Sequence, residues 1–273
     1  MDNEKKVSVI ITTKNEERII AKCLESIVNQ SYSNVEIIVV DNKSTDSTVE
    51  IARKYTDSVY DCGPERSSQK NYGIDIAKGV YALHLDADMI LTPDLVKDAC
   101  DQMLSNPNYV GLNIPLRWVG KNWIIKAKGF EREFYDDTCL DAVRFFDVKT
   151  ARVIKGFDVE LFAGEDWDFD LRLREFGDVG IIDSMMYHYE DENISLKEYA
   201  HKILYYSGSL ELYRNKHKDN KIVKKQFDLL YRYVYVFLER GNWKKCVSHP
   251  LAFVRMYFLK VYMGIVFVGS KKR

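Results

Sequence analysis

Two aspartates separated by one residue are the first candidates for chemistry in this chain. Asp86 and Asp88 flank Ala87 directly after the apolar run Val80–Leu85. Paired carboxylates can hold a hard divalent cation, because Mg²⁺ and Mn²⁺ favour carboxylate oxygen and leave room for substrate phosphates and water. Asp is also common in turns, so the pair alone is a weak signal. Its position at the end of a buried strand favours a Mn²⁺ or Mg²⁺ site.

A second acidic group opens an expected helix over Glu165–Phe176, which Gly177 would end. The helix dipole stabilises ionised acids at a helix N-terminus, so capping alone could explain some of them. Four acids within six residues exceed what a cap requires, and they are Glu165, Asp166, Asp168 and Asp170. We expect one of these acids to serve as a general base for an acceptor hydroxyl.

Basic, imidazole and aromatic side chains form a third set of candidates. Arg66 and Lys70 lie near the start of an expected helix and could reach phosphates or ribose, or could belong to a solvated helix face. His188 follows the last expected strand, Val179–Ile182, and could complete a metal shell, although a lone His is more often ordinary packing. Three aromatic residues could stack on a sugar ring or fill the core: Trp118, Trp123 and Phe130.

The elements that must position these residues alternate between strand and helix. Short apolar runs rich in β-branched residues predict strands at Val7–Ile11, Val35–Val40, Ser58–Tyr60 and Val80–Leu85. Local signals predict three helix starts. Two are capping boxes, Ser47 with Glu50 and Ser195 with Glu198, and the third is the pair Thr92-Pro93. The alternation predicts right-handed βαβ units, and therefore an α/β fold with a mostly parallel sheet flanked by helices.

Ligands of such sheets bind beyond the carboxyl ends of the strands. Three expected strands end in polar, largely acidic residues: Thr12, Thr13, Asn15 and Glu16 after the first, Asp41 and Asn42 after the second, and Asp86 to Asp88 after the fourth. Three such ends on one rim indicate a binding site. The G-x-G-x-x-G and P-loop patterns are missing from the sequence, which disfavours a dinucleotide dehydrogenase or a P-loop kinase.

The charge of the chain is unevenly distributed. Its 273 residues carry a net charge of -1, which gives no reason to expect a nucleic-acid partner. Residues 196–273, however, hold 17 Lys and Arg against 5 Asp and Glu, a net charge of +12, and the first 195 residues carry -13. This asymmetry predicts a catalytic domain over residues 1–194, with halves at about 1–108 and 109–194, and a basic, aromatic, helical extension over 195–273.

Taken together, the motifs resemble those of the family 2 glycosyltransferases, which have the GT-A fold. Five segments match in order: Thr12 to Glu16 at the first strand, Val39 to Asp46 against V-V-D-D-G-S-T-D, Lys70 to Gly79 against R-N-x-G-x-x-x-A-x-G, Asp86 to Asp88 against D-x-D, and Glu165-Asp166 against E-D. Asn42 and Lys43 depart from the second motif. One such motif is weak, whereas five in order over roughly residues 7–190 are specific.

The resemblance implies a nucleotide-sugar donor, with a UDP-sugar favoured and a GDP-sugar possible. It implies donor contacts from Thr12, Thr13, Asn15, Glu16, Asp41, Asn42, Arg66, Lys70, Asp86 and Ala87. Asp88 would ligate the metal, with Asp86 beside it and His188 completing the shell. Asp166 would be the catalytic base, with Glu165 next to it. Transfer would invert the anomeric configuration.

The sequence also narrows the reaction. Processive polysaccharide synthases carry Q-x-x-R-W and several long membrane spans, whereas this chain reads Trp167–Arg172 after Asp166, so addition of one sugar is expected. A nucleotidyltransferase is a rival, but it typically has a Gly-rich basic loop after the first strand. A non-catalytic nucleotide-sugar binding module is a second rival, which the acids Asp86, Asp88 and Asp166 disfavour.

The C-terminal segment Leu251–Val268 is apolar apart from Arg255 and Lys260. It is short for a membrane span, and central cations are costly in hydrocarbon. An interfacial helix on anionic lipid fits better, with a helix packed on the domain or a dimer interface as alternatives. The N-terminus shows no signal-peptide pattern. We therefore expect a cytoplasmic protein, peripheral at the membrane, with a glycan or lipid-linked acceptor. The sequence gives no indication of an oligomeric state.

Overall fold

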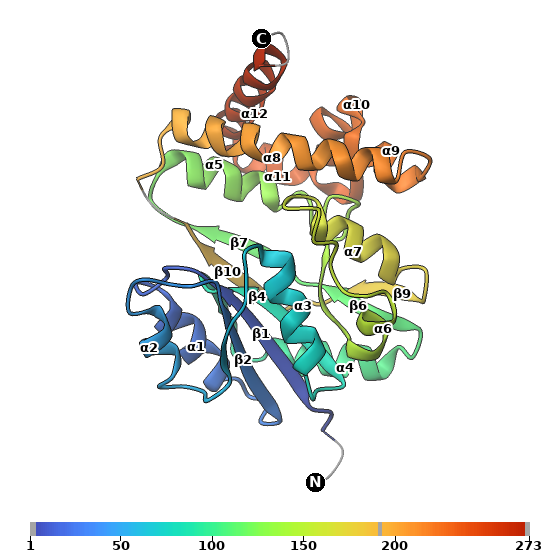
Figure 1. Ribbon diagram of the computed structural model, residues 1–273. Helices are drawn as coiled ribbons and strands as arrows, with labels where there is room; N and C mark the ends of the chain where they lie inside the picture. Colours follow the sequence, from blue (N-terminus) through green and yellow to red (C-terminus); the bar gives the residue numbers. More distant parts are fainter. Residues whose placement is uncertain (1–3, 191–192, 271–273) are drawn as a thin grey trace. The chain divides into compact units, whose positions relative to one another are not determined.

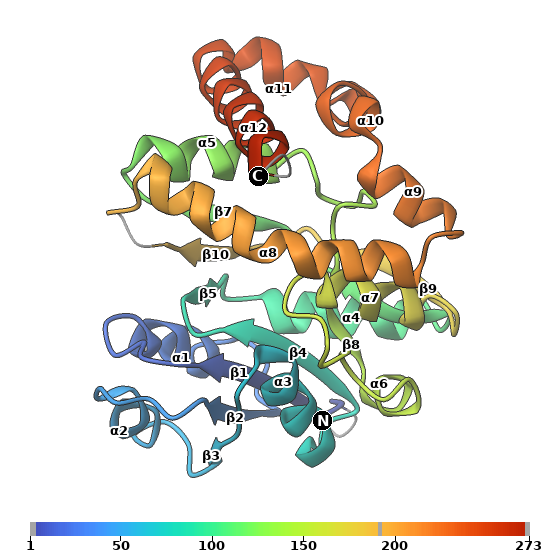
Figure 2. The same ribbon diagram turned by 45° about the horizontal axis from the view of Figure 1, so that its top comes forward.

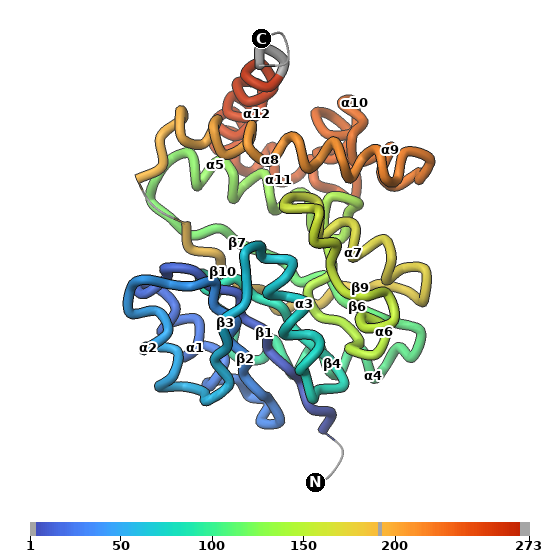
Figure 3. The backbone as a smooth tube through the Cα atoms, viewed as in Figure 1, coloured from blue at the N-terminus to red at the C-terminus, as the bar shows by residue number. Residues whose placement is uncertain are grey.

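The computed structural model describes residues 4–190 and 193–270, which form two compact units (Figure 3). The first unit comprises Met1–Pro115 and Ala142–His188, and the second comprises Leu116–Asp141 and Tyr189–Arg273. Residues 116–141 thus group with the C-terminal extension, whereas the sequence had suggested one catalytic domain over 1–194.

A seven-stranded sheet forms the centre of the first unit (Figure 1). Its strands lie in the order β3-β2-β1-β4-β8-β6-β9. The strands are β1 (Val7–Thr13), β2 (Val35–Asp41), β3 (Val59–Asp61), β4 (Tyr81–Asp86), β6 (Tyr109–Asn113), β8 (Val143–Asp147) and β9 (Asp178–Ile181). Only β8 runs antiparallel to its neighbours, β4 and β6. The expected α/β fold with a mostly parallel sheet is confirmed.

The register of the parallel strands brings the polar strand ends to one edge of the sheet. Thr12 on β1 lies beside Val40 on β2 and beside Asp86 on β4, and Thr13 lies beside Asp41. β1 is buried along its whole length, which explains why β-branched apolar residues dominate it.

Six helices in the described part of the first unit flank this sheet. They are α1 (Ile20–Val28), α2 (Thr48–Ala52), α3 (Arg66–Ile76), α4 (Leu95–Ser105), α6 (Val148–Val153) and α7 (Glu165–Leu173). α3 packs against β1 and β2. A Cβ atom at Gly73 on α3 would lie 2.3 Å from Cγ2 of Ile10, so glycine is required for this close approach.

α2 begins directly after Ser47, as expected, but without the expected capping box, and two other expected helix boundaries were wrong. Ser47 and Glu50 form no capping box, because the Asp46 carboxylate accepts the Thr48 N–H while the Ser47 N–H donates to Glu17. α4 begins at Leu95 rather than at Pro93, since the Thr92 hydroxyl donates to the Met185 carbonyl 2.9 Å away and does not cap the helix. α7 ends at Leu173, three residues before Phe176, so Gly177 does not end it.

The sequence also missed a short antiparallel pair of strands. β5 (Met89–Leu91) follows the Asp86–Asp88 turn and pairs with β10 (Met186–Tyr189), so Val179–Ile182 is not the last strand. His188 lies opposite Met89 in this pair. A three-residue strand leaves little periodicity in a sequence, because it exists only through its partner.

The second unit is mainly helical (Figure 2). It contains β7 (Leu116–Val119), α5 (Trp123–Arg132), α8 (Leu196–Lys216), α9 (Lys221–Phe227), α10 (Leu229–Tyr233), α11 (Trp243–Ser248) and α12 (Pro250–Ser270). The expected capping box of Ser195 and Glu198 is present at the start of α8, and the helix ends at Lys216.

Contacts across the sequence explain why residues 116–141 belong to this unit. The Lys245 ammonium donates to the Glu133 carbonyl at 2.6 Å, and the Gln226 amide donates to the Cys139 carbonyl at 2.7 Å. Lys260 on α12 forms an ion pair with Glu131 on α5. Such pairings join segments about 100 residues apart, so no local pattern announces them.

Candidate active site

An acidic group lies where β1 and β4 end. The Thr12 hydroxyl donates to Oδ1 of Asp86 at 3.2 Å. Glu16 lies close enough to respond to both aspartates, because burial first, and then the charges of Asp88 and Asp86, raise its pKa to about 7. Concentrated negative charge of this kind favours a cation.

His188 and Asp88 are in direct contact. Nε2 of His188 lies 2.9 Å from Oδ2 of Asp88, because the pairing of β10 with β5 sets His188 opposite Met89, the residue after Asp88. The other carboxylate oxygen of Asp88, Oδ1, is buried and has no hydrogen-bond partner among the described residues. A buried carboxylate oxygen without a donor suits a hard cation, so the residues present fit a divalent metal.

The protein would supply few of the ligands. Within residues 4–190 and 193–270, no three His, Cys, Asp or Glu side chains stand in metal-binding geometry. Mg²⁺ and similar ions commonly keep several waters and substrate phosphates beside one or two carboxylates. Asp88, with Asp86 and His188 near it, meets that smaller requirement.

Asp86 is held as an anion by neighbouring cations. Burial would raise the pKa of its carboxyl, but the positive charges of Arg66, Lys70 and Arg144 outweigh burial and hold the pKa well below its usual range. A guanidinium nitrogen of Arg66 lies 4.0 Å from Oδ1 of Asp86, and about half of the Arg66 side chain is exposed. Arg66 is therefore the cation that solvent and ligands can reach.

Lys70 lies in the interior, which rules out a solvated helix face for this residue. It is 2% exposed. Its ammonium lies 2.6 Å from Asp166 and 3.3 Å from Glu165, and 4.6 Å from the centre of the Phe157 ring. A buried cation needs such partners, because burial alone would neutralise it. The pairing sets the start of α7 against α3.

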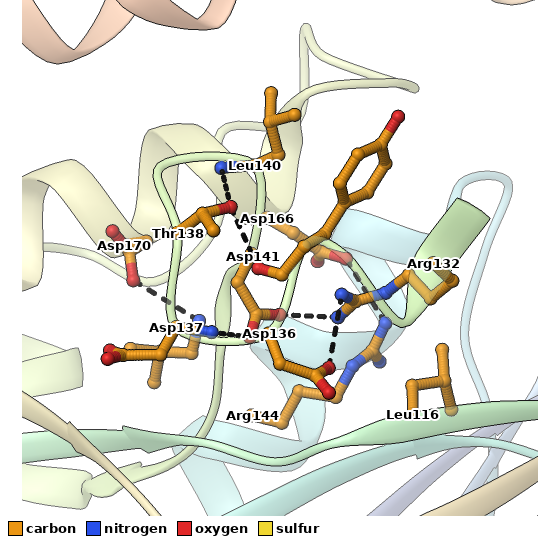
Figure 4. A network of polar contacts seen from close by, with 12 residues as sticks. Leu116, Arg132, Asp136, Asp137, Thr138, Leu140, Asp141, Arg144, Asp166 and Asp170 are labelled. Carbon is orange, nitrogen blue, oxygen red and sulfur yellow. Dashed lines mark hydrogen bonds and ion pairs between the residues drawn. The ribbon is translucent and has the colours of Figure 1, made fainter. Parts of the chain in front are cut away.

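Arg144 on β8 is a cation that the sequence did not point to. Figure 4 shows it beside Asp166, and the two side chains approach to 3.7 Å. Burial would raise the pKa of Asp166, but Lys70 and Arg144 together lower it strongly. Burial, and then the charge of Asp166, raises the pKa of Glu165. The pKa values of the two neighbouring acids thus shift in opposite directions, and Asp166 stays ionised.

Three features fix the position of α7. The side chain of Asn71 on α3 holds the backbone of Phe157 through two hydrogen bonds, of 2.7 and 2.8 Å. The Phe157 ring stacks on Phe169 of α7 at 4.1 Å. Gly164 has φ of 83° directly before the helix, a left-handed conformation that favours glycine. Asn71, the residue after Lys70 in its motif, therefore helps to place Glu165 and Asp166.

The other two acids of α7 are structural. Asp168 is fully buried and pairs with Arg172, which also donates to the carbonyls of Ile154 and Gly156. Asp170 accepts the Val143 N–H and pairs with Arg174 (Figure 4 shows Asp170). Of the four acids at this helix, Glu165 and Asp166 therefore belong to the candidate site, and Asp168 and Asp170 stabilise the fold.

Polar side chains at the ends of β1 and β2 accept hydrogen bonds from the backbone of the loop that follows β2. Oδ1 of Asn15 accepts the Thr45 N–H at 2.8 Å, and the Asp41 carboxylate accepts the Ser44 N–H at 2.7 Å. These contacts shape the loop that follows β2. The Thr13 hydroxyl is buried without a hydrogen-bond partner in the described part of the chain. Ala87 is buried between the two aspartates.

Gln69 is a further residue that the sequence did not single out. Its amide nitrogen donates to the carbonyls of Val40 at 2.6 Å and Thr13 at 3.0 Å. It therefore ties α3 to the ends of β1 and β2. Its only signal in the sequence is its place beside Lys70, one residue before the motif.

Asn42, which departs from the family motif, has a local role. Its amide nitrogen donates to the Pro64 carbonyl at 2.6 Å. A carboxylate at this position has no hydrogen to donate and would repel the carbonyl. The amide therefore matches the particular loop around Gly63 and Pro64 in this chain.

We expect Asn42→Asp to lower the free energy of unfolding by about 1–2 kcal/mol, because one hydrogen bond is replaced by a repulsion. Urea unfolding of both proteins at neutral pH measures the change. Asn108→Asp is the matched control, since Asn108 is exposed in the same unit. Equal unfolding midpoints for the two variants would show that the Pro64 contact contributes nothing.

Comparison with known sequences identifies relatives over much of the chain. Residues 8–155 match the family described as Glycosyl transferase family 2. A chondroitin synthase of Escherichia coli is 27% identical over 210 residues, which are 70% of this chain and 30% of that protein. A poly(ribitol-phosphate) beta-glucosyltransferase of Bacillus spizizenii is 34% identical over 160 residues, 50% of this chain and 22% of that protein. The chain spans less than a third of the length of these relatives.

Solved structures share its fold. The mannosyltransferase PcManGT from Pyrobaculum calidifontis, in complex with GDP-Man and Mn²⁺, has a TM-score of 0.60 at 17% identity, covering 97% of this chain and 76% of that chain. S. aureus TarS 1-349 in complex with UDP-GlcNAc has a TM-score of 0.56 at 18% identity, covering 92% of this chain and 79% of that chain. At such identities the likeness concerns the fold, which is GT-A. Because the family match extends over more than half of its residues, this chain belongs to glycosyl transferase family 2.

Proposed function

We propose that this chain transfers a single sugar from a nucleoside-diphosphate sugar to a hydroxyl acceptor, with inversion at the anomeric carbon. The observation that carries the proposal is the pairing of Asp166 with buried Lys70 near the Asp86–Asp88 turn. Lys70 and Arg144 lower the pKa of both Asp86 and Asp166, so the same cations act on both carboxylates. An ionised base and a cation-binding turn are what this reaction requires.

Asp166 is the better candidate for the base. Its side chain is 26% exposed, against 9% for Glu165, and its lowered pKa keeps it ionised. A strongly lowered pKa makes a weak base, but the acceptor hydroxyl becomes acidic as its oxygen bonds to the anomeric carbon. Asp166 would take that proton while the bond from the anomeric carbon to the phosphate oxygen breaks. Glu165 would hold Lys70 in position.

Cations would bind the leaving group. Arg66 is half exposed and lies at the first position of α3, near Asp86. We propose that it contacts the diphosphate, and that Thr12, Thr13, Asp41 and Asn42 border the nucleoside. Asn15 and Glu16 would shape the same edge. When bound at Asp88, with Asp86 and His188 near it, a divalent cation supplies positive charge to the departing diphosphate.

The donor and acceptor follow by analogy with relatives. The TarS structure holds UDP-GlcNAc and the PcManGT structure holds GDP-Man with Mn²⁺. We therefore propose a UDP- or GDP-sugar donor and Mn²⁺ or Mg²⁺ as cofactor. Relatives with names such as chondroitin synthase and poly(ribitol-phosphate) beta-glucosyltransferase support a surface-glycan or lipid-linked acceptor. The basic extension supports a location at the cytoplasmic face of the membrane.

A hydrolysis screen of UDP-, GDP- and dTDP-sugars with Mn²⁺ tests the proposed activity. We expect release of the nucleoside diphosphate from one donor class, because water can attack the anomeric carbon of the bound donor when no acceptor is present. The product must be the nucleoside diphosphate and the free sugar. Release of nucleoside monophosphate, or no release from any donor class, would contradict sugar transfer.

The metal role gives a separate prediction. We expect Asp88→Asn to weaken Mn²⁺ binding by about tenfold or more and to lower hydrolysis at low Mn²⁺, since a neutral amide is a poorer ligand for a hard cation. Titration calorimetry with Mn²⁺ and a nucleoside diphosphate measures it. Asp101→Asn, at an exposed acid on α4, is the control. Unchanged Mn²⁺ affinity in Asp88→Asn would remove Asp88 from the metal site.

A further inference from the structure

The charge in the middle of α12 is satisfied inside the protein. Lys260 is 8% exposed, forms an ion pair with Glu131 and donates to the Tyr135 hydroxyl at 3.1 Å. Met256, Leu259 and Met263 are buried on the same side of the helix. α12 therefore packs on α5 through a face that contains a cation, within a single compact unit.

The opposite face of α12 is apolar and exposed. Five side chains, with exposures from 39% to 66%, form an outer stripe: Leu251, Val254, Phe258, Val261 and Ile265. Their spacing of three and four residues places them in one row along the helix. A helix on the surface of a soluble protein usually turns its apolar side chains inward and its polar side chains outward. In α12, the charged Lys260 points inward and the apolar outer stripe points outward.

The neighbouring helix also exposes apolar side chains. α11 packs against α12 and exposes Trp243 by 50% and Val247 by 70%, four residues apart. Cations accompany these side chains, since Lys244 on α11 and Arg255 on α12 are both exposed. Large apolar groups flanked by Trp and basic residues are typical of surfaces that lie in the headgroup region of a bilayer.

Two alternatives fit the stripe less well. By length and composition Pro250–Phe267 is the one candidate membrane span in the described part of the chain, but Lys260 is committed to Glu131 on a different helix. A second copy of the chain would bring two extensions of net charge +12 together, whereas an anionic bilayer neutralises them. A single row of side chains is also narrow for a stable dimer, which buries about 800 Å² per partner.

We propose that the outer stripe of α12 inserts into the headgroup boundary of an anionic bilayer, with the helix lying along the surface and Lys244 and Arg255 contacting lipid phosphates. The inference deepens the membrane location within the proposed function by naming the face that binds. It does not depend on sugar transfer.

Co-sedimentation with vesicles tests the outer stripe. The probe is phosphatidylcholine vesicles with and without about 30% phosphatidylglycerol, which supplies the negative surface potential. We expect the wild-type chain to bind the anionic vesicles, and Val254→Ser/Phe258→Ser to bind them at least about tenfold more weakly. Val28→Ser/Leu104→Ser is the matched control, because these apolar residues of the first unit are 59% and 50% exposed.

A charge variant tests the second half of the proposal. We expect Lys244→Gln/Arg255→Gln to lose about tenfold or more of its binding to anionic vesicles and to resemble wild type on pure phosphatidylcholine. Lys22→Gln/Lys97→Gln, at exposed lysines of the first unit, should bind as wild type does. High salt should weaken wild-type binding in the same way, since it screens exposed charges.

Three outcomes would overturn the proposal. They are no binding of wild type to anionic vesicles, equal binding of the stripe variant and its control, or a dimer in sedimentation velocity that the stripe variant abolishes. Thermal unfolding of each variant shows that it is folded. Vesicle binding is measured without donor, and donor hydrolysis without vesicles, so failure of one proposal leaves the other standing.

Discussion

Asp166→Asn is expected to lower the rate of sugar transfer by at least about 10³-fold while donor binding stays within about threefold of wild type. An amide cannot take the acceptor proton, and general base catalysis typically contributes about 10²–10⁴-fold. The pairs with Lys70 and Arg144 weaken when the charge is removed, but the side chain keeps its size. Single-turnover transfer and calorimetry with the nucleoside diphosphate measure the two quantities.

Two companion variants make this result specific. Asp168→Asn changes an acid of the same helix that is fully buried and paired with Arg172, so it should affect mainly stability. Glu165→Gln should retain more transfer than Asp166→Asn, because Glu165 acts by holding Lys70. Near-normal transfer by Asp166→Asn, or a greater loss in Glu165→Gln, would move the base assignment away from Asp166.

Lys70→Met should give the largest loss of stability, about 3–5 kcal/mol in the free energy of unfolding. Removing one partner of a buried ion pair leaves the other charge in a medium that solvates it poorly. Here two carboxylates would lose their shared cation, which lies 2.6 and 3.3 Å from them. Urea unfolding measures the loss. Lys97→Met, at an exposed lysine of α4, should change stability by less than about 0.5 kcal/mol.

The pH dependence of this loss has a definite sign. Asp166 has a lowered pKa in the folded wild type, so its ion pairs stabilise the protein above its unfolded pKa and are lost as the pH falls. In Lys70→Met the two acids can take up protons when the pH falls, which relieves their repulsion. The stability gap between wild type and variant should therefore narrow from pH 7 toward pH 4. A gap that is constant over this range would mean that lost packing, and not charge, destabilises the variant.

A double variant tests whether Lys70 and Glu165 stabilise the protein through their mutual interaction. Glu165→Gln removes one of the two acids, so Lys70→Met/Glu165→Gln should recover part of the stability lost in Lys70→Met. Strictly additive effects of the two changes would indicate that Glu165 and Lys70 do not stabilise each other in solution.

The sequence predicted strands β1 to β4 and the polar residues at the ends of β1, β2 and β4. β-branched runs such as Val7–Ile11 become strands wherever both faces are covered, and parallel pairing then places their carboxyl ends on one edge. Five motifs in order were enough to predict the family and the fold. The capping box of Ser195 was also readable, because it involves residues only three apart.

Only the tertiary structure decided which residues meet. It buried Lys70 between Glu165 and Asp166, added Arg144 from β8, and brought His188 to Asp88, 100 residues away, through the short β5–β10 pair. It also assigned Asp168 and Asp170 to the scaffold. Local propensity acts over a few residues, whereas these contacts depend on which strands and helices become neighbours.

In the C-terminal extension, too, the sequence specified the composition and the tertiary structure decided the contacts. The sequence displayed an apolar helix with two cations and a strong positive charge, and left its environment open among membrane, domain and dimer. The fold placed Lys260 against Glu131 and turned the outer stripe of α12 to the exterior. Composition specifies how much apolar surface and charge a helix carries. Which face is buried depends on the partner helix, and here that partner is α5, more than 100 residues earlier in the chain.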